Sequence, residues 1–307
     1  MFAALADWNG DGRIAHVIWR IRLPRTVAGI LAGGGLGLSG VVVQNILRNP
    51  LASPFTIGVS QGAACGAAFA IIVLGAGQTH RVGSGGVTLG SPHLVVVCAF
   101  AGALLAVTFI LVLASLRHVT SEAVILSGVA LSAFFGATTM LLQYFADDIQ
   151  VAATVFWTFG DLGKASWPRN AAMAVAGAVP FVWFVAGRFN HNALQWGDEV
   201  ARSLGVRVRR LRITAMVLAA LTVAVITSFL GIIGFVGLMA PHLMRLVVGN
   251  DHRFLIPASA LFGALLLLVS DIVARTLMAP VILPVGIITS FCGAPLFFYL
   301  LVRPRRP

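Results

Sequence analysis

Few side chains inside the long apolar stretches of this chain could do chemistry, and Asp271 and Arg275 are the clearest pair. They stand four residues apart, a spacing that places both side chains on one face of a helix, where they can form an ion pair. Ionisable residues within a membrane span are costly to bury and are functional candidates for that reason. The pair lies near one end of its apolar stretch, so both a structural ion pair and a functional role for Asp271 stay open.

Motifs for other kinds of chemistry are absent from the sequence. It contains no H-E-x-x-H or G-x-S-x-G motif and no G-x-x-x-x-G-K-[ST] phosphate loop, and its three cysteines (Cys65, Cys98 and Cys292) form no C-x-x-C pair. The seven histidines have no metal-ligand spacing: His16, His80, His93, His118, His191, His242 and His252. We therefore expect no catalytic residue, no metal site and no cofactor in this chain, and we interpret the cysteines as small packing residues.

The run GGGLGLSG, residues 33–40, resembles a phosphate-binding loop in composition only. It lacks the Lys-Ser/Thr ending and falls inside an apolar stretch, where small residues let helices approach closely. We predict helix packing there rather than nucleotide binding.

The composition identifies an integral membrane protein. Of the 307 residues, 59% are hydrophobic and only 10% are charged, with a mean hydropathy of +0.96. A soluble domain usually has about 25% charged residues. Nine apolar runs reach roughly the length that spans a bilayer: Thr26–Leu47, Phe55–Leu74, Leu94–Leu116, Ala123–Phe145, Asn170–Ala186, Leu211–Leu230, Ile232–Val248, Leu255–Met278 and Ile282–Val302.

These runs lack the period-two alternation of an outer-membrane barrel. The predicted fold class is an all-α, polytopic helical bundle with about nine spans. We expect residues 1–307 to form a single transmembrane domain, in which a polar segment at about 190–212 forms two short amphipathic helices divided at Gly205.

The net charge of +11 could suggest nucleic-acid binding, but the basic residues are scattered over loops at the ends of the apolar runs. Lys and Arg mark cytoplasmic loops. With alternating loops and the C-terminal tail VRPRRP in the cytoplasm, 13 basic residues face inside and 8 face outside. The inner set is Arg48, Arg117, Arg188, Arg202, Arg207, Arg209, Arg210, Arg212, Arg245, Arg253, Arg303, Arg305 and Arg306, and the outer set is Arg13, Arg20, Arg22, Arg25, Arg81, Lys164, Arg169 and Arg275. An odd number of spans then places the N-terminus outside, and no signal peptide is evident.

Three stretches together resemble the permease subunits of bacterial ABC importers for iron–siderophore, haem and cobalamin, of the type II class. They are RIRLPRTVAGILAGGGLGLSGVVVQNILRNPLASPFTIGVSQGAA (residues 20–64), GIIGFVGLMAPHLMRLVVGNDHRFLIPASALFGALLLLVSDIVAR (residues 231–275) and LPVGIITSFCGAPLFFYLL (residues 283–301). The likeness runs from about Arg20 to the end of the chain and is loose at residues 75–91 and 147–167.

The resemblance implies a ten-span subunit that works as a homodimer in the bacterial inner membrane, with its C-terminus in the cytoplasm. Its implied partners are two copies of an ABC ATPase, which would bind ATP and Mg²⁺, and an external, periplasmic substrate-binding protein. Membrane lipid surrounds it, and no nucleic acid is implied. The family's first span would precede Trp8 and is not found in this sequence.

The resemblance also implies roles for individual residues. Arg22, Arg25 and Arg275 match positions that receive acidic residues of the binding protein, with headgroup contact by interfacial arginine as the alternative. Asp198, Glu199, Ala201, Arg202, Leu204 and Gly205 match the coupling helices that contact the ATPase. Asn49 and Leu51 match one layer of a cytoplasmic gate, and Thr120 and Ser121 match the other.

The segment RNPLASP, residues 48–54, interrupts the apolar stretches at the first gate layer. Two prolines break the helix there, and irregular backbone within a membrane is tolerated where it lines a cavity. A plain connection between helices is the alternative.

We expect ATP-dependent import of a metal chelate, with the ATPase in another subunit and no enzymatic activity in this chain. An ion-gradient-driven transporter or channel is the alternative, but such proteins usually place carboxylates near the bilayer midplane, whereas Glu122, Asp147 and Asp148 flank their apolar run. The sequence does not choose among siderophore, haem, cobalamin and oxyanion cargo, and it identifies no cargo-binding residue.

Overall fold

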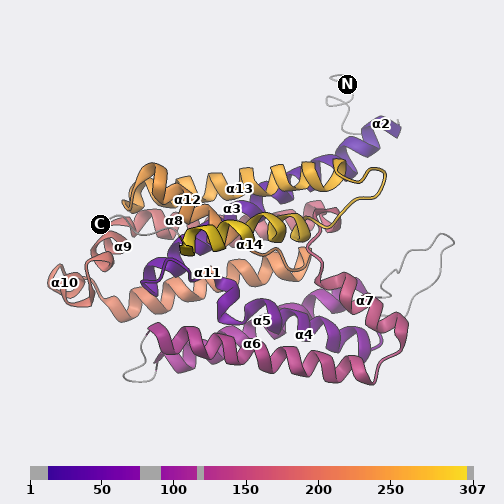
Figure 1. Ribbon diagram of the computed structural model, residues 1–307, viewed down its shortest axis with the longest axis horizontal. Coiled ribbons are helices and arrows are strands. Elements are labelled where there is room, and N and C mark those ends of the chain that lie inside the picture. The colour runs from indigo at the N-terminus through magenta and orange to yellow at the C-terminus, as the bar shows by residue number, and fades with distance from the viewer. Residues whose placement is uncertain (1–12, 77–90, 116–120, 303–307) are drawn as a thin grey trace.

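The computed structural model describes residues 13–76, 91–115 and 121–302, and it confirms an all-helical architecture (Figure 1). Residue Thr120 of the expected gate, and the region around Trp8, lie outside the described residues. In chain order the elements are α2 (Arg13–His16), the π-helical turn η1 (Val17–Arg22), α3 (Leu23–Ile46), the 3₁₀ turn η2 (Pro54–Ile57), α4 (Val59–Ile72), α5 (Pro92–Ser115), α6 (Ser121–Tyr144), α7 (Asp148–Thr158), the 3₁₀ turn η3 (Leu162–Lys164), α8 (Trp167–Ala186), α9 (Arg188–Gln195), α10 (Asp198–Ser203), α11 (Val208–Leu230), α12 (Val236–Val248), α13 (His252–Thr276) and α14 (Val285–Val302).

Each of the nine predicted apolar runs contains one helix, but the helices differ in length. Within the described chain, six are long and apolar enough to cross a membrane (in α3, α5, α6, α8, α11 and α13), while α4, α12 and α14 contain shorter apolar helices. The short helices begin late because an irregular backbone position or a proline precedes each of them. Gly58 and Phe235 have positive φ immediately before α4 and α12, and Pro284 precedes α14. Apolar composition predicts membrane burial, whereas these residues decide where the helix can start.

Helix α7 was not predicted from the sequence. It follows α6 after a short turn, and the side chain of Gln150 accepts a hydrogen bond from the backbone N–H of Asp147, one half of a capping box. This local signal could have revealed the helix. Its 11 residues are too few for a span, so a search for long apolar runs passes over it.

Helix α3 is the central element of the bundle. In the apolar 18-residue window of the span Ile14–Ile46, which includes α3, 72% of the residues are buried, compared with 11% in the window of α6 at the periphery. It packs most extensively on α13 and also contacts α12, α11 and α8. Figure 1 shows α12 and α13 above, α4, α5 and α6 below, and α11 between the two groups. Helix α3 therefore packs directly against both α12 and α13 of the upper group.

Small residues allow α3 and α13 to touch through their backbones. A Cβ atom at Gly33 would collide with the carbonyl oxygen of Gly263, and one at Gly263 would collide with that of Gly33. Gly62 of α4 and Gly102 of α5 oppose one another in the same way. The prediction that the run 33–40 serves helix packing is confirmed.

Candidate functional site

Two polar clusters lie at opposite ends of α3. The helix has 24 residues, so its ends are about 36 Å apart. We call the first the arginine cluster, which consists of Arg22, Arg25, Asp161, Asp271 and Arg275. We call the second the junction, which consists of Asn45, His191, Asn192, Gln195 and His252. The described basic residues predicted to face opposite sides of the membrane likewise gather at these two ends.

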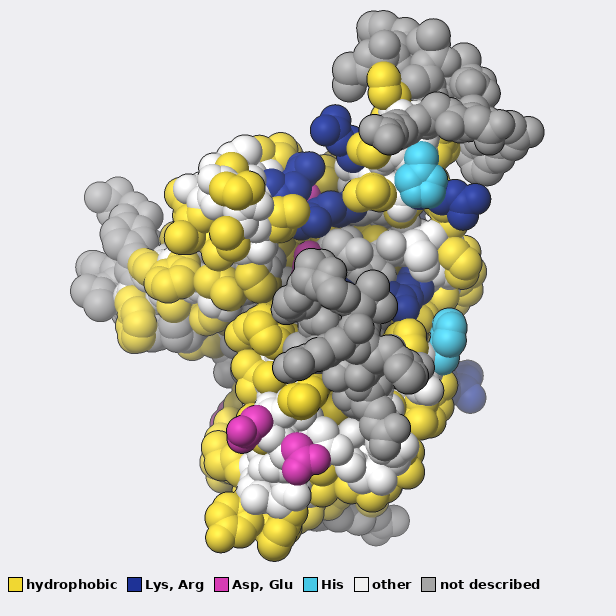
Figure 2. Space-filling view, turned by 90° about the vertical axis from the view of Figure 1, so that its right-hand side faces the viewer, with side chains coloured by type: hydrophobic (Ala, Val, Ile, Leu, Met, Phe, Trp, Pro, Cys, Tyr) yellow, Lys and Arg dark blue, Asp and Glu magenta, His cyan; other side chains and the backbone are white. Residues whose placement is uncertain are grey.

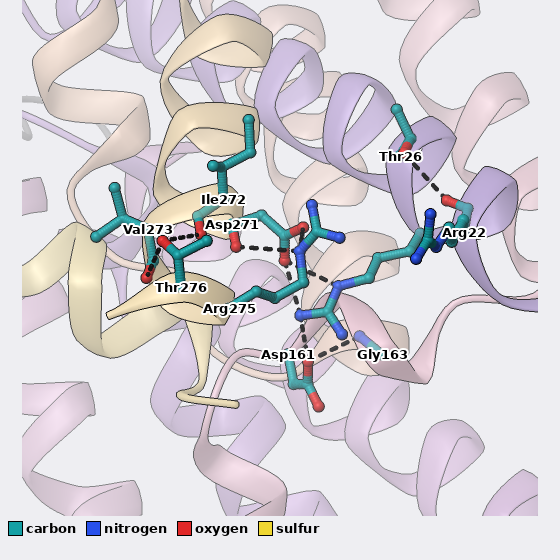
Figure 3. Close-up of polar contacts among 10 residues, drawn as sticks. Arg22, Thr26, Asp161, Gly163, Asp271, Ile272, Val273, Arg275 and Thr276 are labelled. Atoms are coloured by element: carbon teal, nitrogen blue, oxygen red, sulfur yellow. Dashed lines mark hydrogen bonds and ion pairs between the residues drawn. The ribbon is translucent and has the colours of Figure 1, made fainter. Parts of the chain in front are cut away.

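Asp271 is the centre of the arginine cluster. Arg25 of α3 donates from Nε and Nη2 to Asp271 Oδ1 at 2.9 and 2.7 Å, and Figure 3 shows Asp271 near Arg275 and Asp161. Arg275 Nε lies 3.1 Å from Asp271 Oδ2, which confirms the ion pair predicted from the four-residue spacing. The Asp271 side chain is only 4% exposed, and Asp161 adds a longer contact of 3.6 Å to Arg25. The cluster thus joins α3, α13 and the turn at η3.

The three arginines expected at a docking surface differ in their availability. Arg25 is 11% exposed and engaged with two carboxylates, so it mainly supports the cluster. Arg275 is 39% exposed although it also contacts Asp271, and Arg22 is exposed on η1. Figure 2 shows Lys and Arg side chains gathered on the upper part of this end of the molecule. Arg22 and Arg275 are therefore the members that an approaching protein could reach.

Lys164 holds the turn beside the arginine cluster. Its Nζ donates to the carbonyl oxygens of Trp157 and Phe159, each at 3.0 Å. Burial lowers the pKa of Lys164 to about 8, because the charged amine loses its hydration, and the nearby Asp161 opposes this effect. Lys164 thereby links the end of α7 to η3. The sequence did not indicate this contact.

The polar segment at 190–212 forms two short helices, as predicted, but their boundary is different. The break between α9 and α10 is at Gly197, whose φ is +116°. Gly205, with a φ of +82°, instead separates α10 from α11. Both glycines adopt a backbone conformation that costs other residues energy, and the prediction that Gly205 divides the two short helices was wrong, because Gly197 makes that turn.

The residues of α10 and the following turn face two ways. Asp198 is bound by both terminal nitrogens of Arg212, at 3.0 and 2.8 Å, and lies 3.6 Å from Arg48, while Ala201 is fully buried. The outward face is formed by residues on and around the helix: Trp196, Glu199, Val200, Arg202, Leu204 and Gly205. Trp196, Val200 and Leu204 are large apolar side chains in exposed positions. Exposed apolar side chains among charged ones are typical of a protein-binding surface.

The junction fixes α9 against α3. The Nδ1–H of His191 donates to Asn45 Oδ1 at 2.9 Å, because an amide oxygen can only accept. Asn45 Nδ2 donates back to the carbonyl oxygen of His191 at 3.2 Å. His191 is fully buried, and this burial lowers its pKa to about 4. The imidazole is therefore neutral near pH 7.

The same helix holds the start of α13. Asn192 accepts from the backbone N–H of His252 at 2.8 Å and donates to Asp251 at 2.8 Å, and Gln195 donates to the carbonyl oxygen of Asn250 at 2.9 Å. The rings of His191 and His252 stack 5.8 Å apart. Sequence reasoning missed both histidines because it tested histidine spacing for metal binding only.

The interruption between α3 and α4 is also confirmed. The backbone is irregular from Leu47 to Gly58, with Arg48 at a positive φ of 50°. Asn49 Oδ1 accepts a hydrogen bond from the N–H of Leu51 at 2.9 Å, so these two expected gate residues form one turn. Of the other expected layer, Ser121 begins α6 and Thr120 lies outside the described residues.

Comparison with known proteins gives matches over nearly the whole chain. The family model of the FecCD transport family matches residues 1–303. The chain is 53% identical over 294 residues to a protein of Methanocaldococcus jannaschii named as an ABC transporter permease, covering 96% of this chain and 84% of that one. It is 37% identical to the hemin transport system permease HmuU of Yersinia pestis and 38% identical to the vitamin B12 import permease BtuC of Salmonella arizonae, each covering 99% of this chain and 88% of the relative.

Solved structures show the same fold. An inward-facing conformation of a metal-chelate type ABC transporter superposes with a TM-score of 0.83 at 31% identity, covering 98% of this chain and 95% of that chain. PsaBC from Streptococcus pneumoniae has a TM-score of 0.61 at 16% identity, covering 99% of this chain and 97% of that chain, and supports the fold alone. The resemblance inferred from the sequence is confirmed, and the chain belongs to the FecCD transport family of ABC importer permeases.

Proposed function

We propose that this chain is the membrane permease of an ATP-driven importer that carries a metal chelate, with an iron siderophore or haem as the first candidates and cobalamin as the next. The similarity over 98% of the chain to a metal-chelate type transporter carries this proposal. The names of HmuU and BtuC support the same cargo classes. The protein works in a bacterial inner membrane, with α9, α10 and the C-terminus on the cytoplasmic side.

Two copies form the transport path between them. An apolar hollow of about 590 Å³ in this chain suits the lining of such a path, because a bulky chelate must pass without being held tightly. It lies between the segment after α7, the loop before α12, and α14, and its walls include Phe159, Gly160, Ile232, Gly286, Ile287 and Phe291. No acidic or basic residue belongs to the lining of this hollow.

The ATPase is a separate subunit that binds ATP and Mg²⁺, and this chain itself is not an enzyme. The exposed face of α10, with Glu199, Arg202 and Leu204, and the turn at Gly205 contact that subunit. Asp198 and Ala201 act from the inner face by holding α10 on the bundle. Movement of the ATPase dimer then displaces α10 as a rigid body.

An external binding protein delivers the cargo at the other end. Its acidic side chains pair with Arg22 and Arg275, while Arg25 positions Arg275 through Asp271. Exposed pairs contribute about 0–1 kcal/mol each, so they orient the docked protein more than they hold it. Asn49 and Leu51, together with Thr120 and Ser121, form the gate at the cytoplasmic mouth.

Reconstitution with the ATPase and the binding protein tests this function. Cargo uptake into vesicles should require ATP hydrolysis and should fall at least tenfold in Arg202→Glu, because the reversed charge disrupts the α10 contact. Arg202→Lys is the matched control, since it keeps the charge, and should retain most of the uptake.

Two results would contradict the proposal. One is uphill cargo movement by the chain alone, without any ATPase. The other is uptake that collapses with an uncoupler while ATP is held constant, which would indicate an ion-gradient-driven transporter.

A further inference from the structure

An open cavity of about 340 Å³, lined mostly by polar residues, lies next to the junction, where the ends of α3, α9 and α12 meet the start of α13. It is separate from the apolar hollow and shares no residue with it. Its lining consists of Gln44, Asn45, Arg48, Asn49, Pro50, Gln195, Arg245, Asn250 and His252. Both charged residues of this lining are arginines, and no Asp or Glu belongs to it.

Arg245 has no counterion in the described chain. Its one hydrogen bond there runs from Nη2 to Gln44 Oε1 at 3.0 Å, and no described carboxylate lies within 4 Å of it. Gln44 is itself buried and donates to the carbonyl oxygen of Leu238, so Arg245 is held by a fixed neighbour. A partly buried guanidinium that lacks an anionic partner loses hydration that its one hydrogen bond to Gln44 compensates only in part.

The rest of the wall supplies further hydrogen-bonding groups. The Arg48 side chain is 46% exposed, and it lies 3.6 Å from Asp198, a residue outside the cavity. His252 is 3% exposed, and its Nε2 atom has no hydrogen-bond partner in the described chain. Asn49 and Asn250 add amide groups. Guanidinium and amide groups that line one cavity suit an oxygen-bearing anion.

We propose that this cavity is a binding site for a small oxyanion, represented by inorganic phosphate, with Arg245 as its principal ligand and Arg48 as the second. A phosphate group offers several acceptor oxygens and can pair with both guanidinium groups. Bound there, it bridges the turn after α3 and the last turn of α12, beside the junction. The site goes beyond the transport function, because it requires neither the cargo nor the ATPase.

Equilibrium binding of radiolabelled inorganic phosphate tests the site. We would use the purified chain in nanodiscs of phosphatidylcholine at pH 7 and constant ionic strength. The expected result is saturable binding of one phosphate per chain. Arg245→Gln should weaken it at least tenfold, since a charge-assisted hydrogen bond contributes about 1.5–3 kcal/mol. Arg253→Gln removes an exposed arginine outside the cavity at the same end, and should leave binding unchanged.

A second arm distinguishes free phosphate from a lipid headgroup. If phosphatidylglycerol in the nanodisc displaces the labelled phosphate, the lipid phosphate occupies the cavity, and if it does not, the ligand is the free anion. The absence of saturable binding in phosphatidylcholine, or equal binding by Arg245→Gln and the wild type, would overturn the proposal.

A measurement on the wild type covers the case in which Arg245→Gln fails to fold. Phosphate should slow the modification of Arg245 by phenylglyoxal, mapped by mass spectrometry, and should not slow that of Arg253. Equal modification of Arg245 with and without phosphate would overturn the proposal in the same way.

Discussion

At one end of the α3–α13 pair, Arg25 and Asp271 join the helices through full charges, whereas at the other end Asn45, His191 and His252 join them to α9 through neutral groups. Asp271 is 4% exposed and His191 is fully buried, so both contacts are shielded from water. A buried charge is very costly to leave unpaired, while a buried neutral donor costs less. The arginine cluster should therefore be the more sensitive to loss of one partner.

The largest effect is expected for Asp271→Asn. This change leaves Arg25 without its closest counterion, and breaking a buried ion pair costs about 3–5 kcal/mol. Unfolding by SDS in mixed micelles would measure the loss. Asp161→Asn is the matched control, because that carboxylate is 36% exposed and 3.6 Å from Arg25, and it should cost less than about 1 kcal/mol. Equal costs for both variants would contradict the central role of Asp271.

Acidification should weaken the junction. Burial lowers the pKa of His191 from 6.5 to about 4, so between these values the unfolded chain binds a proton that the folded chain does not. The contribution of His191 to the free energy of unfolding is complete above pH 6.5 and is lost as the pH falls toward 4. The loss is up to about 1.4 kcal/mol per pH unit and about 3 kcal/mol in all. His191→Gln should show a shallower loss of stability over this window. If the variant and the wild type follow the same curve, the effect does not come from His191.

Asn45→Ala tests the neutral contacts directly. It leaves the buried His191 Nδ1–H and the His191 carbonyl without their partner, which should lower the free energy of unfolding by about 2 kcal/mol. The same mixed-micelle titration applies. Asn49→Ala removes an amide of the same kind from a half-buried turn and should cost less than about 1 kcal/mol. A cost for Asn45→Ala above that of Asp271→Asn would reverse the comparison of the two ends.

The smallest effect over a single pH unit is expected for Lys164, beside the arginine cluster. Its pKa is lowered from 10.5 to about 8, so the folded chain releases this proton first as the pH rises. Stability should increase above pH 8, by about 1 kcal/mol over the first unit, because the folded chain no longer buries a charged amine. Lys164→Met should lack this rise. The two ends of the molecule would then lose or gain stability in separate pH ranges. A rise in stability that persists in Lys164→Met would show that it comes from another group.

Some of the candidate site could be read from local spacing. The Asp271–Arg275 pair follows from a separation of one helical turn, and the two short helices at 190–212 follow from a polar segment that contains glycine. The partner of Asp271 on α3 could not be found in this way, because Arg25 is 246 residues away in the sequence. The same holds for Asn45 and His191, which are 146 residues apart.

The sequence by itself determined the class of the protein, the nine apolar helices found in its described residues and the separation of its positive residues into two groups. These properties depend on composition and on neighbours along the chain, since hydration and helix periodicity act locally. Only the tertiary structure decided which arginines are paired, which histidines are buried and that Arg245 has no counterion among the described residues. Pairing and desolvation depend on distances between segments that are far apart in the sequence, and only the packing of α3 against α13, α12 and α9 establishes those distances.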